Sequence, residues 1–437
     1  MKNATLSARL ERAPSWQFTL FTASAAFLLY TCVYGFRKAF SVATFDAWVF
    51  LGIGYKVWLV TAQVAGYALS KFIGIKVVSE MKAGRRAQSI FWLVLVAGSA
   101  WGLFALVPAP YNLLCVFLNG LPLGMIWGLI FSYLEGRQTT DVLGAGLSIS
   151  FIFSAGFAKT VGAWLMALGT TETWMPFTAS VLFFLPLLVA LWLLDHVPPP
   201  SAQDEQLRTK RKPMQARERF QFMAAFATGL VLIISAYLLL TMLRDFRDNF
   251  AAELWMALGY ADAQSVFTTT EIPIACVVLV VMGSLIMVRS NAKALFINHL
   301  IILTGFALMG IGTVLFQHQL ISPFTWMVLT GLGLYLGYVP FNCIFFERLM
   351  AAFKYVGTVG FVMYLADSVG YLGSVGVLFY KEFAFPQLSW LTFYTEATLA
   401  VSVGGIVLVG ASMVYFDRKL RKAGVELPSN PAANALV

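Results

Sequence analysis

The chain has 437 residues, of which 59% are hydrophobic and only 12% are charged. With a mean hydropathy of +0.78, this composition excludes a soluble globular domain, in which about 25% of residues are charged. The formal charge of +9 does not indicate a nucleic-acid-binding protein, because the cations gather in loops that flank apolar segments.

Apolar stretches of about 20 residues, the length that crosses a hydrocarbon core of about 30 Å, recur throughout the chain. Short charged or Gly- and Pro-rich breaks separate them. The sequence therefore predicts an all-α membrane protein with twelve transmembrane helices. The predicted spans are 17–44, 56–79, 88–108, 112–134, 144–168, 174–194, 220–248, 262–288, 294–316, 324–346, 357–380 and 391–416.

The first span is too long for a cleaved signal peptide, so it is interpreted as an uncleaved first helix. If both termini lie on one side of the membrane, that side carries 22 of the 30 Lys and Arg residues. The opposite side carries only Lys56 and Lys381. This asymmetry follows the positive-inside rule. It predicts a multi-pass protein of the cell inner (plasma) membrane with both termini in the cytoplasm.

A segment rich in proline, glutamine and charge, residues 195–219, is predicted to be a cytoplasmic linker. It divides the chain into two six-helix bundles, residues 1–194 and 220–417. A cytoplasmic tail, residues 418–437, follows the second bundle.

Three short matches at nearly one offset indicate that the two bundles arose by duplication. "AKTVG" from Ala158 matches "ADSVG" from Ala366, and Arg37 matches Arg244, 207 residues later. The third match pairs glutamates near the ends of the fourth and tenth spans. Two halves in the same orientation predict a pseudo-two-fold axis along the membrane normal, with a central cavity between them.

Ten ionisable residues are predicted to lie at membrane depth, where each costs roughly 2.5 to 3.5 kcal/mol at the bilayer centre. They are therefore expected to line a cavity or to pair with one another. Six cations against four acids leave an excess of two positive charges, which an anionic substrate is able to neutralise. The ten residues are Arg37, Lys38, Lys71, Lys159, Arg244, Asp245, Arg247, Asp248, Glu271 and Asp367.

One face of the first predicted helix presents Arg37 together with Tyr34 and Tyr30, at helical spacings of three and seven. Lys38 points about 100° away from that face. A planar guanidinium from each half, Arg37 and Arg244, is predicted to form a bidentate clamp suited to phosphate or carboxylate.

A structural alternative exists for the arginines of the seventh span. Arg244 and Arg247 are then neutralised by Asp245 and Asp248 in an ion-pair cluster that only stabilises the fold. Arg37 has no acid nearby in the sequence, so this alternative does not extend to it.

Lys159 and Asp367 occupy repeat-related positions and carry opposite charges. They are predicted to pair across the cavity and to hold it shut from one side, with a static bridge between the halves as the alternative. Glu271 or Asp367 is alternatively a proton carrier, because buried carboxylates near cations act as relay groups. Asp245 and Asp248 join them as candidates for gating or proton coupling.

No constellation in the sequence indicates an enzyme. The three histidines lack metal-ligand spacing, and no nucleophilic triad or carboxylate pair in a soluble domain is present. The sequence therefore predicts no enzymatic activity, no metal site and no cofactor.

Four segments resemble the organophosphate:phosphate antiporter branch of the major facilitator superfamily, which includes glycerol-3-phosphate and hexose-phosphate transporters. "YGFRKAF" at 34–40 is similar to its Tyr-x-x-Arg-Lys-Asn-Phe motif, and "GYALSKFIG" at 66–74 is similar to its Gly-Phe-Ser-Lys-Phe segment. "MLRDFRDNF" at 242–250 and "YLADSVGYLGS" at 364–374 resemble segments of its seventh and eleventh helices. The loop at 74–86 is similar to the Gly-x-x-x-Asp-Arg-x-Gly-Arg-Arg loop of the wider superfamily.

The resemblance implies that Arg37 and Arg244 hold a substrate phosphate, with Lys38 adjacent. It implies the major facilitator fold and a secondary transporter that moves a small organic anion, a phosphorylated or carboxylated metabolite, by alternating access. Inorganic phosphate and a proton are the candidate coupling ions. The expected partners are this solute and the lipid bilayer, with no nucleic acid, and the protein is expected to be a monomer.

The sequence departs from that branch at several charged positions. Asp367 replaces a glycine, Asp245 directly follows the helix-seven arginine, and Glu271 occupies a small-residue position. The helix-five histidine of the glycerol-phosphate transporters is absent, and Lys159 lies farther along that helix. These charges keep two alternatives open, a proton-coupled symporter of a zwitterionic solute and a membrane sensor that binds a phosphorylated metabolite without moving it.

Overall fold

The computed structural model describes residues 4–79, 81–135, 137, 139–200, 204, 216–261, 264–353 and 360–422. In this part of the chain, twelve α-helices contain 21 or more residues. Each predicted span overlaps one of them, so the predicted all-α membrane fold is confirmed. The helices are α2 (Ser15–Lys38), α3 (Tyr55–Ser79), α4 (Arg86–Leu106), α5 (Leu113–Leu134), α6 (Thr140–Ala167), α7 (Met175–Asp195), α9 (Ala216–Asn249), α11 (Val266–Ile286), α12 (Asn291–Gln317), α13 (Pro323–Cys343), α15 (Gly360–Ala384) and α16 (Trp390–Lys422).

Ten of the twelve helices are long and apolar enough to cross a membrane. The remaining two, α3 and α15, carry polar side chains that are turned away from the surface of the protein. Gln63 is buried on α3, and the side chains of Lys71 on α3 and Asp367 on α15 are only 14% and 15% exposed. These two helices therefore combine the length of a membrane span with an interior polar face.

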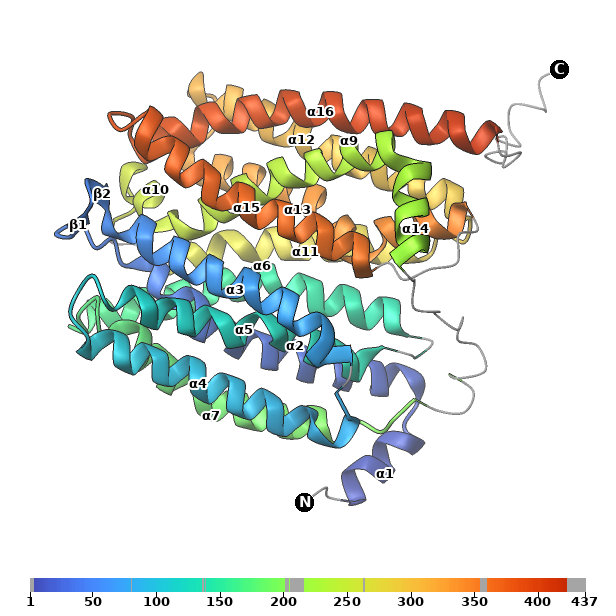
Figure 1. Cartoon of the computed structure of the whole chain (residues 1–437), viewed down its shortest axis with the longest axis horizontal. Coiled ribbons are helices and arrows are strands. Elements are labelled where there is room, and N and C mark those ends of the chain that lie inside the picture. Colours follow the sequence, from blue (N-terminus) through green and yellow to red (C-terminus); the bar gives the residue numbers. More distant parts are fainter. Residues whose placement is uncertain are drawn as a thin grey trace.

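Short elements lie at the two ends of the long helices (Figure 1). At one end, α1 (Ala4–Arg12) leads into α2, and α14 (Phe345–Ala352) packs against α12. The opposite end holds α10 (Ala251–Ala257) and an antiparallel hairpin of β1 (Val49–Phe50) and β2 (Ile53–Gly54). The 3-10 helices η1 and η2 cover Ala39–Val42 and Ala83–Arg85.

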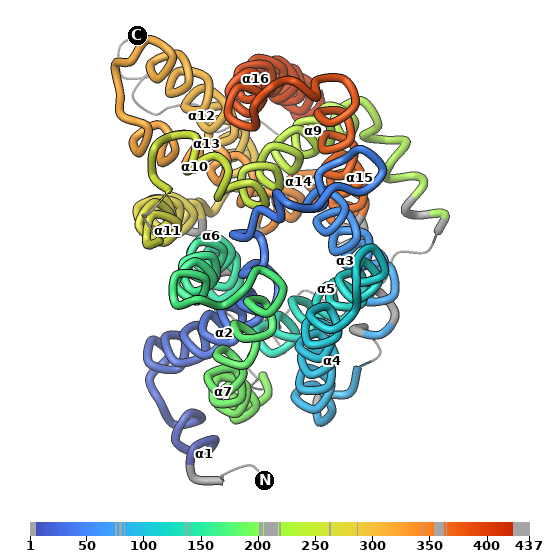
Figure 2. Tube along the Cα trace, turned by 90° about the vertical axis from the view of Figure 1, so that its left-hand side faces the viewer, coloured from blue at the N-terminus to red at the C-terminus, as the bar shows by residue number. Residues whose placement is uncertain are grey.

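The long helices form two six-helix bundles, the first from α2 to α7 and the second from α9, α11, α12, α13, α15 and α16 (Figure 2). Two pairs of helices, α6 with α11 and α3 with α15, make contacts between the bundles, and α6 also contacts α13. In chain order, α3 and α11 are the second helices of their bundles, and α6 and α15 are the fifth. The two contacts are thus related by the predicted pseudo-two-fold axis.

Close packing joins the bundles along both helix pairs. A Cβ added to Gly156 on α6 would lie 2.3 Å from the Phe267 carbonyl oxygen on α11, so only glycine permits this approach. Nearby, the Thr268 hydroxyl donates to the Thr160 hydroxyl at 2.7 Å. Between α3 and α15, the rings of Trp58 and Phe379 have centroids 5.4 Å apart.

The predicted linker and tail fall in part outside the described residues, as does Glu80 of the superfamily-like loop. α7 ends at Asp195, and α9 already begins at Ala216, inside the predicted linker. α16 continues to Lys422, six residues past the predicted end of the twelfth span. The predicted domain boundaries remain predictions.

Candidate functional site

The last turn of α2 is held by donors from three other helices. The Gln63 amide on α3 donates to the Arg37 carbonyl oxygen at 3.0 Å, and the Trp101 indole on α4 donates to the Phe36 carbonyl oxygen at 2.6 Å. Asn119 on α5 also donates to Phe36 and accepts from Gln63 at 2.9 Å. Carbonyls at the end of a helix lack partners within that helix. This network satisfies them and fixes the direction in which α2 presents Arg37.

Arg37 is 8% exposed and is surrounded by aromatic rings. Its guanidinium carbon lies 3.8 Å from the centroid of the Tyr67 ring. Four tyrosines, Tyr67, Tyr371, Tyr34 and Tyr30, interact with it electrostatically, and so does the neighbouring cation Lys38. Among the described residues, no carboxylate forms an ion pair with Arg37, and its Nε has no hydrogen-bond partner. The faces of these rings stabilise a cation but do not neutralise its charge.

Arg244 on α9 has a different environment. Its guanidinium lies 4.0 Å from the Tyr338 ring centroid, and its Nη2 and Nε donate to Asp245 Oδ1 at 2.6 and 3.1 Å. The structural alternative, in which Asp245 neutralises Arg244, is therefore the observed pairing. Asp245 Oδ2 is buried and accepts no hydrogen bond from the described residues, although Ser374 faces this carboxylate.

The two arginines face the same aromatic side chains. Tyr34 interacts electrostatically with both Arg37 and Arg244, and so does Tyr371. The ring of Tyr30 packs edge-on against that of Tyr34, with centroids 5.3 Å apart. The structure thus brings four of the predicted substrate-binding residues together in the buried region between the bundles.

Lys38 and Lys159 share one carboxylate, that of Asp248 on α9. Lys38 Nζ lies 2.5 Å from Asp248 Oδ2 and donates to the Asn249 amide oxygen at 2.8 Å. Lys159 on α6 donates to the other carboxylate oxygen. The lysine and aspartate side chains are at most 12% exposed. The cluster joins two helices of the first bundle to one helix of the second.

The predicted pairing of Lys159 with Asp367 is wrong. Asp367 lies on α15, which packs on α3 rather than on α6, so its cation is Lys71, at 3.7 Å. The Tyr237 hydroxyl on α9 donates to Asp367 at 2.5 Å. The fifth helices α6 and α15 are repeat-related, and each packs on the second helix of the opposite bundle. This topology separates Lys159 from Asp367.

Arg247 and Glu271 form a pair within the second bundle. Arg247 Nη1 donates to Glu271 Oε1 at 2.7 Å, and Nη2 donates to the Met327 carbonyl oxygen at 3.2 Å. The alternative that placed Arg247 against Asp248 is therefore wrong, because Asp248 is bound by two lysines. Gating or proton-carrying roles for Glu271, Asp245, Asp248 and Asp367 stay predictions.

A further pair links the bundles at the end that holds the β-hairpin. Lys56, at the start of α3, lies 2.5 Å from Glu253 on α10 and also donates to the Ser41 carbonyl oxygen at 2.8 Å. From the charge distribution along the sequence, Lys56 was expected as one of the two cations on the side opposite the termini. The position of α10 beside η1 is what brings a partner to it.

Two tyrosines of the site, contributed by α3 and α15, were not predicted from the sequence. Tyr67 and Tyr371 have ring centroids 5.4 Å apart, so they meet at the contact between the bundles. A signal was present in the sequence, because Tyr67 precedes Lys71 by four residues and Tyr371 follows Asp367 by four. Residues four apart share a face of a helix.

The described residues contain no group of three or more His, Cys, Asp and Glu side chains placed to hold a metal ion. The buried arginines, lysines and tyrosines supply donors for an anion. A planar guanidinium without a carboxylate partner matches the geometry of a phosphate or carboxylate group.

A family model described as "Family of unknown function (DUF5690)" matches residues 39–419. A search of the curated proteins finds no match to this chain. Solved structures give clearer matches. The crystal structure of a D-xylose–proton symporter aligns with a TM-score of 0.61 and 15% identity, over 92% of this chain and 97% of that chain.

Two further structures are similar over nearly their full length. A bacterial homologue of the human drug peptide transporters PepT1 and PepT2 has a TM-score of 0.60 and 10% identity, covering 92% of this chain and 99% of that one. The nucleoside transporter NupG has a TM-score of 0.58 and 15% identity, covering 91% and 99%. At these identities the likeness shows the fold alone, which is the major facilitator fold.

Proposed function

This chain belongs to the family of unknown function DUF5690, and from its buried site we propose that it is a secondary transporter that moves a small organic anion by alternating access. The phosphorylated metabolites are the favoured class, with carboxylated metabolites next. The two bundles rock about the region that holds Arg37 and Arg244, and the anion neutralises the site while it is occluded.

Arg37 is the observation that carries this proposal. It is buried, its Nε has no hydrogen-bond partner, and aromatic rings surround it. Each of the other buried cations of the site has a carboxylate among the described residues. An unpaired charge in an apolar interior is costly. A protein retains such a cation when a ligand supplies the missing negative charge.

The distribution of the excess charge supports a phosphate monoester. Arg244, Arg247 and Lys71 each have a carboxylate of their own, whereas Lys38 and Lys159 share that of Asp248. The two excess positive charges therefore lie at Arg37 and around Asp248, on and beside the last turn of α2. A phosphate monoester carries about 1.5 to 2 negative charges at pH 7, which matches this excess.

The ion pairs between the bundles support alternating access. Lys56–Glu253 lies at the hairpin end, and Lys71–Asp367 lies about 22 Å farther along α3, by the rise of 1.5 Å per residue. One pair is therefore placed on each side of Gln63. Opening toward one side separates one pair and leaves the other intact.

A zwitterionic solute is the second candidate. Asp245 Oδ2 is a buried acceptor without a donor among the described residues, and it lies on the residue next to Arg244. An ammonium group on the solute is able to donate to this oxygen while its acidic group reaches Arg37. The resemblance to organophosphate:phosphate antiporters favours the first candidate, and the extra carboxylates favour the second.

The proposal also includes the orientation of the protein in the membrane. The last turn of α16 and the entry into α2 lie at one end of the protein (Figure 1), and the loops at that end carry most of the cations. By the positive-inside rule, this end faces the cytoplasm of the plasma (inner) membrane.

A thermal-shift screen of the purified full chain tests the proposal. We expect glycerol 3-phosphate or glucose 6-phosphate to raise the midpoint of unfolding, and D-xylose at the same concentration to leave it unchanged. In Arg37→Gln the shift should disappear. Arg289→Gln is the matched control because Arg289 is exposed on the surface, so it should keep the full shift.

Three results would contradict the anion site. They are stabilisation by the neutral sugar alone, stabilisation that persists in Arg37→Gln, and loss of the shift in Arg289→Gln. If an amino acid is the solute that stabilises, and Asp245→Asn removes its effect, the zwitterion candidate replaces the first one. Binding without flux in proteoliposomes would instead identify a sensor.

A further inference from the structure

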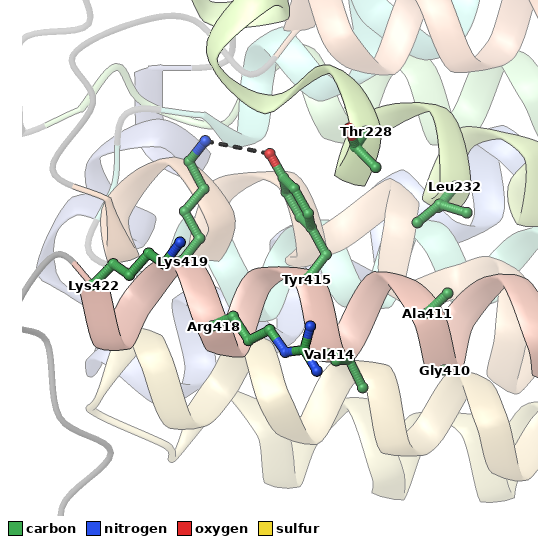
Figure 3. A pocket seen from close by; sticks show the side chains of 9 residues that line it. All are labelled: Thr228, Leu232, Gly410, Ala411, Val414, Tyr415, Arg418, Lys419 and Lys422. Atoms are coloured by element: carbon green, nitrogen blue, oxygen red, sulfur yellow. Dashed lines mark hydrogen bonds between the residues drawn. The ribbon is translucent and has the colours of Figure 1, made fainter.

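A groove of about 870 Å³ runs between α9 and α16, and none of the site residues lines it (Figure 3). One wall is a single face of α16, from Gly410 to Lys422, and Leu232 on α9 lies opposite. The twelve residue-to-residue steps from Gly410 to Lys422 correspond to about 18 Å. This length is close to half of a hydrocarbon core of about 30 Å.

The groove is apolar toward the middle of α16. Leu232 and Val414 line it there, and Val414 is 45% exposed. At Gly410 the space is open, because an added Cβ would have no atom within 4 Å. Apolar surface of this kind, on a helix that crosses the membrane, is suited to contact with an acyl chain.

The other end of the groove is cationic. Arg418, Lys419 and Lys422 line it, at the last turns of α16 (Figure 3). Arg418 and Lys422 are exposed and form no ion pair within the described part of the chain. The one acid of these turns, Asp417, is bound by Arg421 at 3.0 Å and is not part of the lining. The lining therefore has an uncompensated positive charge.

Lys419 connects α16 to α9 at the cationic end of the groove. Its ammonium donates to the Ala225 carbonyl oxygen on α9 and to the Tyr415 hydroxyl on its own helix, the latter at 3.2 Å. It also lies 4.7 Å from the ring centroid of Phe226, where α9 has non-helical dihedral angles. The kink in α9 and the lysine contact thus set the width of the cationic end.

We propose that this groove binds a diacyl phospholipid with an anionic headgroup. The lipid phosphate lies against Arg418 and Lys422, and one acyl chain follows Leu232 and Val414 toward Gly410. Charge complementarity selects the headgroup, because basic residues at a membrane surface attract anionic lipids. The matching length and the change from cationic to apolar lining select a lipid over a soluble anion.

Native mass spectrometry of the purified full chain, with phosphatidylglycerol or phosphatidylcholine added to the detergent, tests this inference. We expect wild type to retain phosphatidylglycerol in preference to phosphatidylcholine. The double variant Arg418→Gln/Lys422→Gln should retain about tenfold less phosphatidylglycerol. Arg421→Gln removes a neighbouring cation that does not line the groove, so its retention should equal that of wild type.

A second variant tests the apolar end without changing any charge. Gly410→Phe fills the open space beside Val414 and should also reduce phosphatidylglycerol retention. Equal retention of the two lipids, equal loss in Arg421→Gln, or full retention in Gly410→Phe would overturn the proposal. Displacement of the lipid by soluble glycerol 3-phosphate would assign the cationic end to a free phosphate compound instead.

Discussion

The two bundles share one fold but carry opposite buried charge. The first contributes four cations to the region between them, and its described residues include no buried acid. The second contributes two arginines and four acids. The four cations are Arg37, Lys38, Lys71 and Lys159, and the second set is Arg244, Arg247, Asp245, Asp248, Glu271 and Asp367. Duplication has therefore kept the helix arrangement while the charges diverged.

This difference explains how the charges of the two bundles pair, and why Arg37 has no carboxylate partner among the described residues. Lys38, Lys71 and Lys159 find their carboxylates on the opposite bundle. Arg244 finds its carboxylate on its own helix. Arg37 has none among the described residues. The cations of the first bundle are thus paired with acids of the second except at Arg37, where the proposed anionic solute would supply the negative charge.

The largest expected effect is that of Asp248→Asn, which removes the carboxylate shared by Lys38 and Lys159. Two buried ammonium groups then lose their partner, so we expect the free energy of unfolding to fall by about 3 to 5 kcal/mol. Denaturant unfolding followed by tryptophan fluorescence measures it. The triple variant Lys38→Met/Lys159→Met/Asp248→Asn, which removes all three charges, should recover most of the loss. A single variant no less stable than the triple one would refute the shared pairing.

The comparison of the two arginines gives the next effect. Arg244→Gln leaves the Asp245 carboxylate buried without its cation, so we expect a loss of about 2 to 3 kcal/mol in unfolding free energy. Arg37→Gln leaves no carboxylate unpaired and should cost less than about 1 kcal/mol. Adding Asp245→Asn to Arg244→Gln should restore stability. Equal losses in the two single variants would show that Arg37 has an acidic partner.

A smaller effect on stability is expected at Asp367, whose ion pair with Lys71 joins the two bundles. Asp367→Asn weakens the contact with Lys71 and should cost about 1 kcal/mol in stability. If Asp367 also carries a proton between states, this variant loses the dependence of uptake on a pH gradient. Glu271→Gln breaks a pair inside the second bundle and should leave that dependence intact. An unchanged pH response in Asp367→Asn would exclude it as the coupling group.

The smallest effect concerns Glu253, which lies on α10 outside the membrane-spanning helices. Burial raises the pKa of Glu253 above its ordinary value of 4.5, and the ion pair with Lys56 only partly opposes this. The folded state therefore holds this proton more tightly than the unfolded state. Stability should fall as pH rises from 4.5 through the raised pKa, by about 1.4 kcal/mol for each pH unit that separates the pKa values of the folded and unfolded states.

The free energy of unfolding, measured across this pH range in wild type and Glu253→Gln, tests this prediction. The variant cannot ionise at this position, so this part of the pH dependence should be missing from its profile. Identical profiles in the two proteins would mean that Glu253 has the same pKa in the folded and unfolded states.

The long helices were predictable because hydropathy over about 20 residues reports burial in lipid directly. The short elements α10 and α14 were not predicted, since seven or eight residues give too little periodicity. The repeat correctly indicated that Arg37 and Arg244 belong to equivalent helices. It could not indicate that α15 packs on α3, and so it paired Lys159 with the wrong carboxylate.

Only two of the four tyrosines around Arg37 were predicted from the sequence. Tyr34 and Tyr30 lie on the same helix as Arg37, and helical periodicity places them beside it. Tyr67 and Tyr371 come from two other helices, one in each bundle. Contacts between helices depend on the packing of the whole bundle, which local spacing does not contain. The same holds for the pair of Lys56 with its glutamate, 197 residues away in the chain.

Counterflow of a radiolabelled organic anion is the most direct measurement of the central claim, with the anion chosen by the thermal-shift screen. Proteoliposomes loaded with the unlabelled anion should accumulate the labelled one when they contain wild type or Arg289→Gln. Vesicles with Arg37→Gln, which is expected to fold but lacks the guanidinium, should accumulate none above protein-free vesicles. Wild-type counterflow by Arg37→Gln would contradict the account, because the solute would then be bound without the buried cation that has no carboxylate among the described residues.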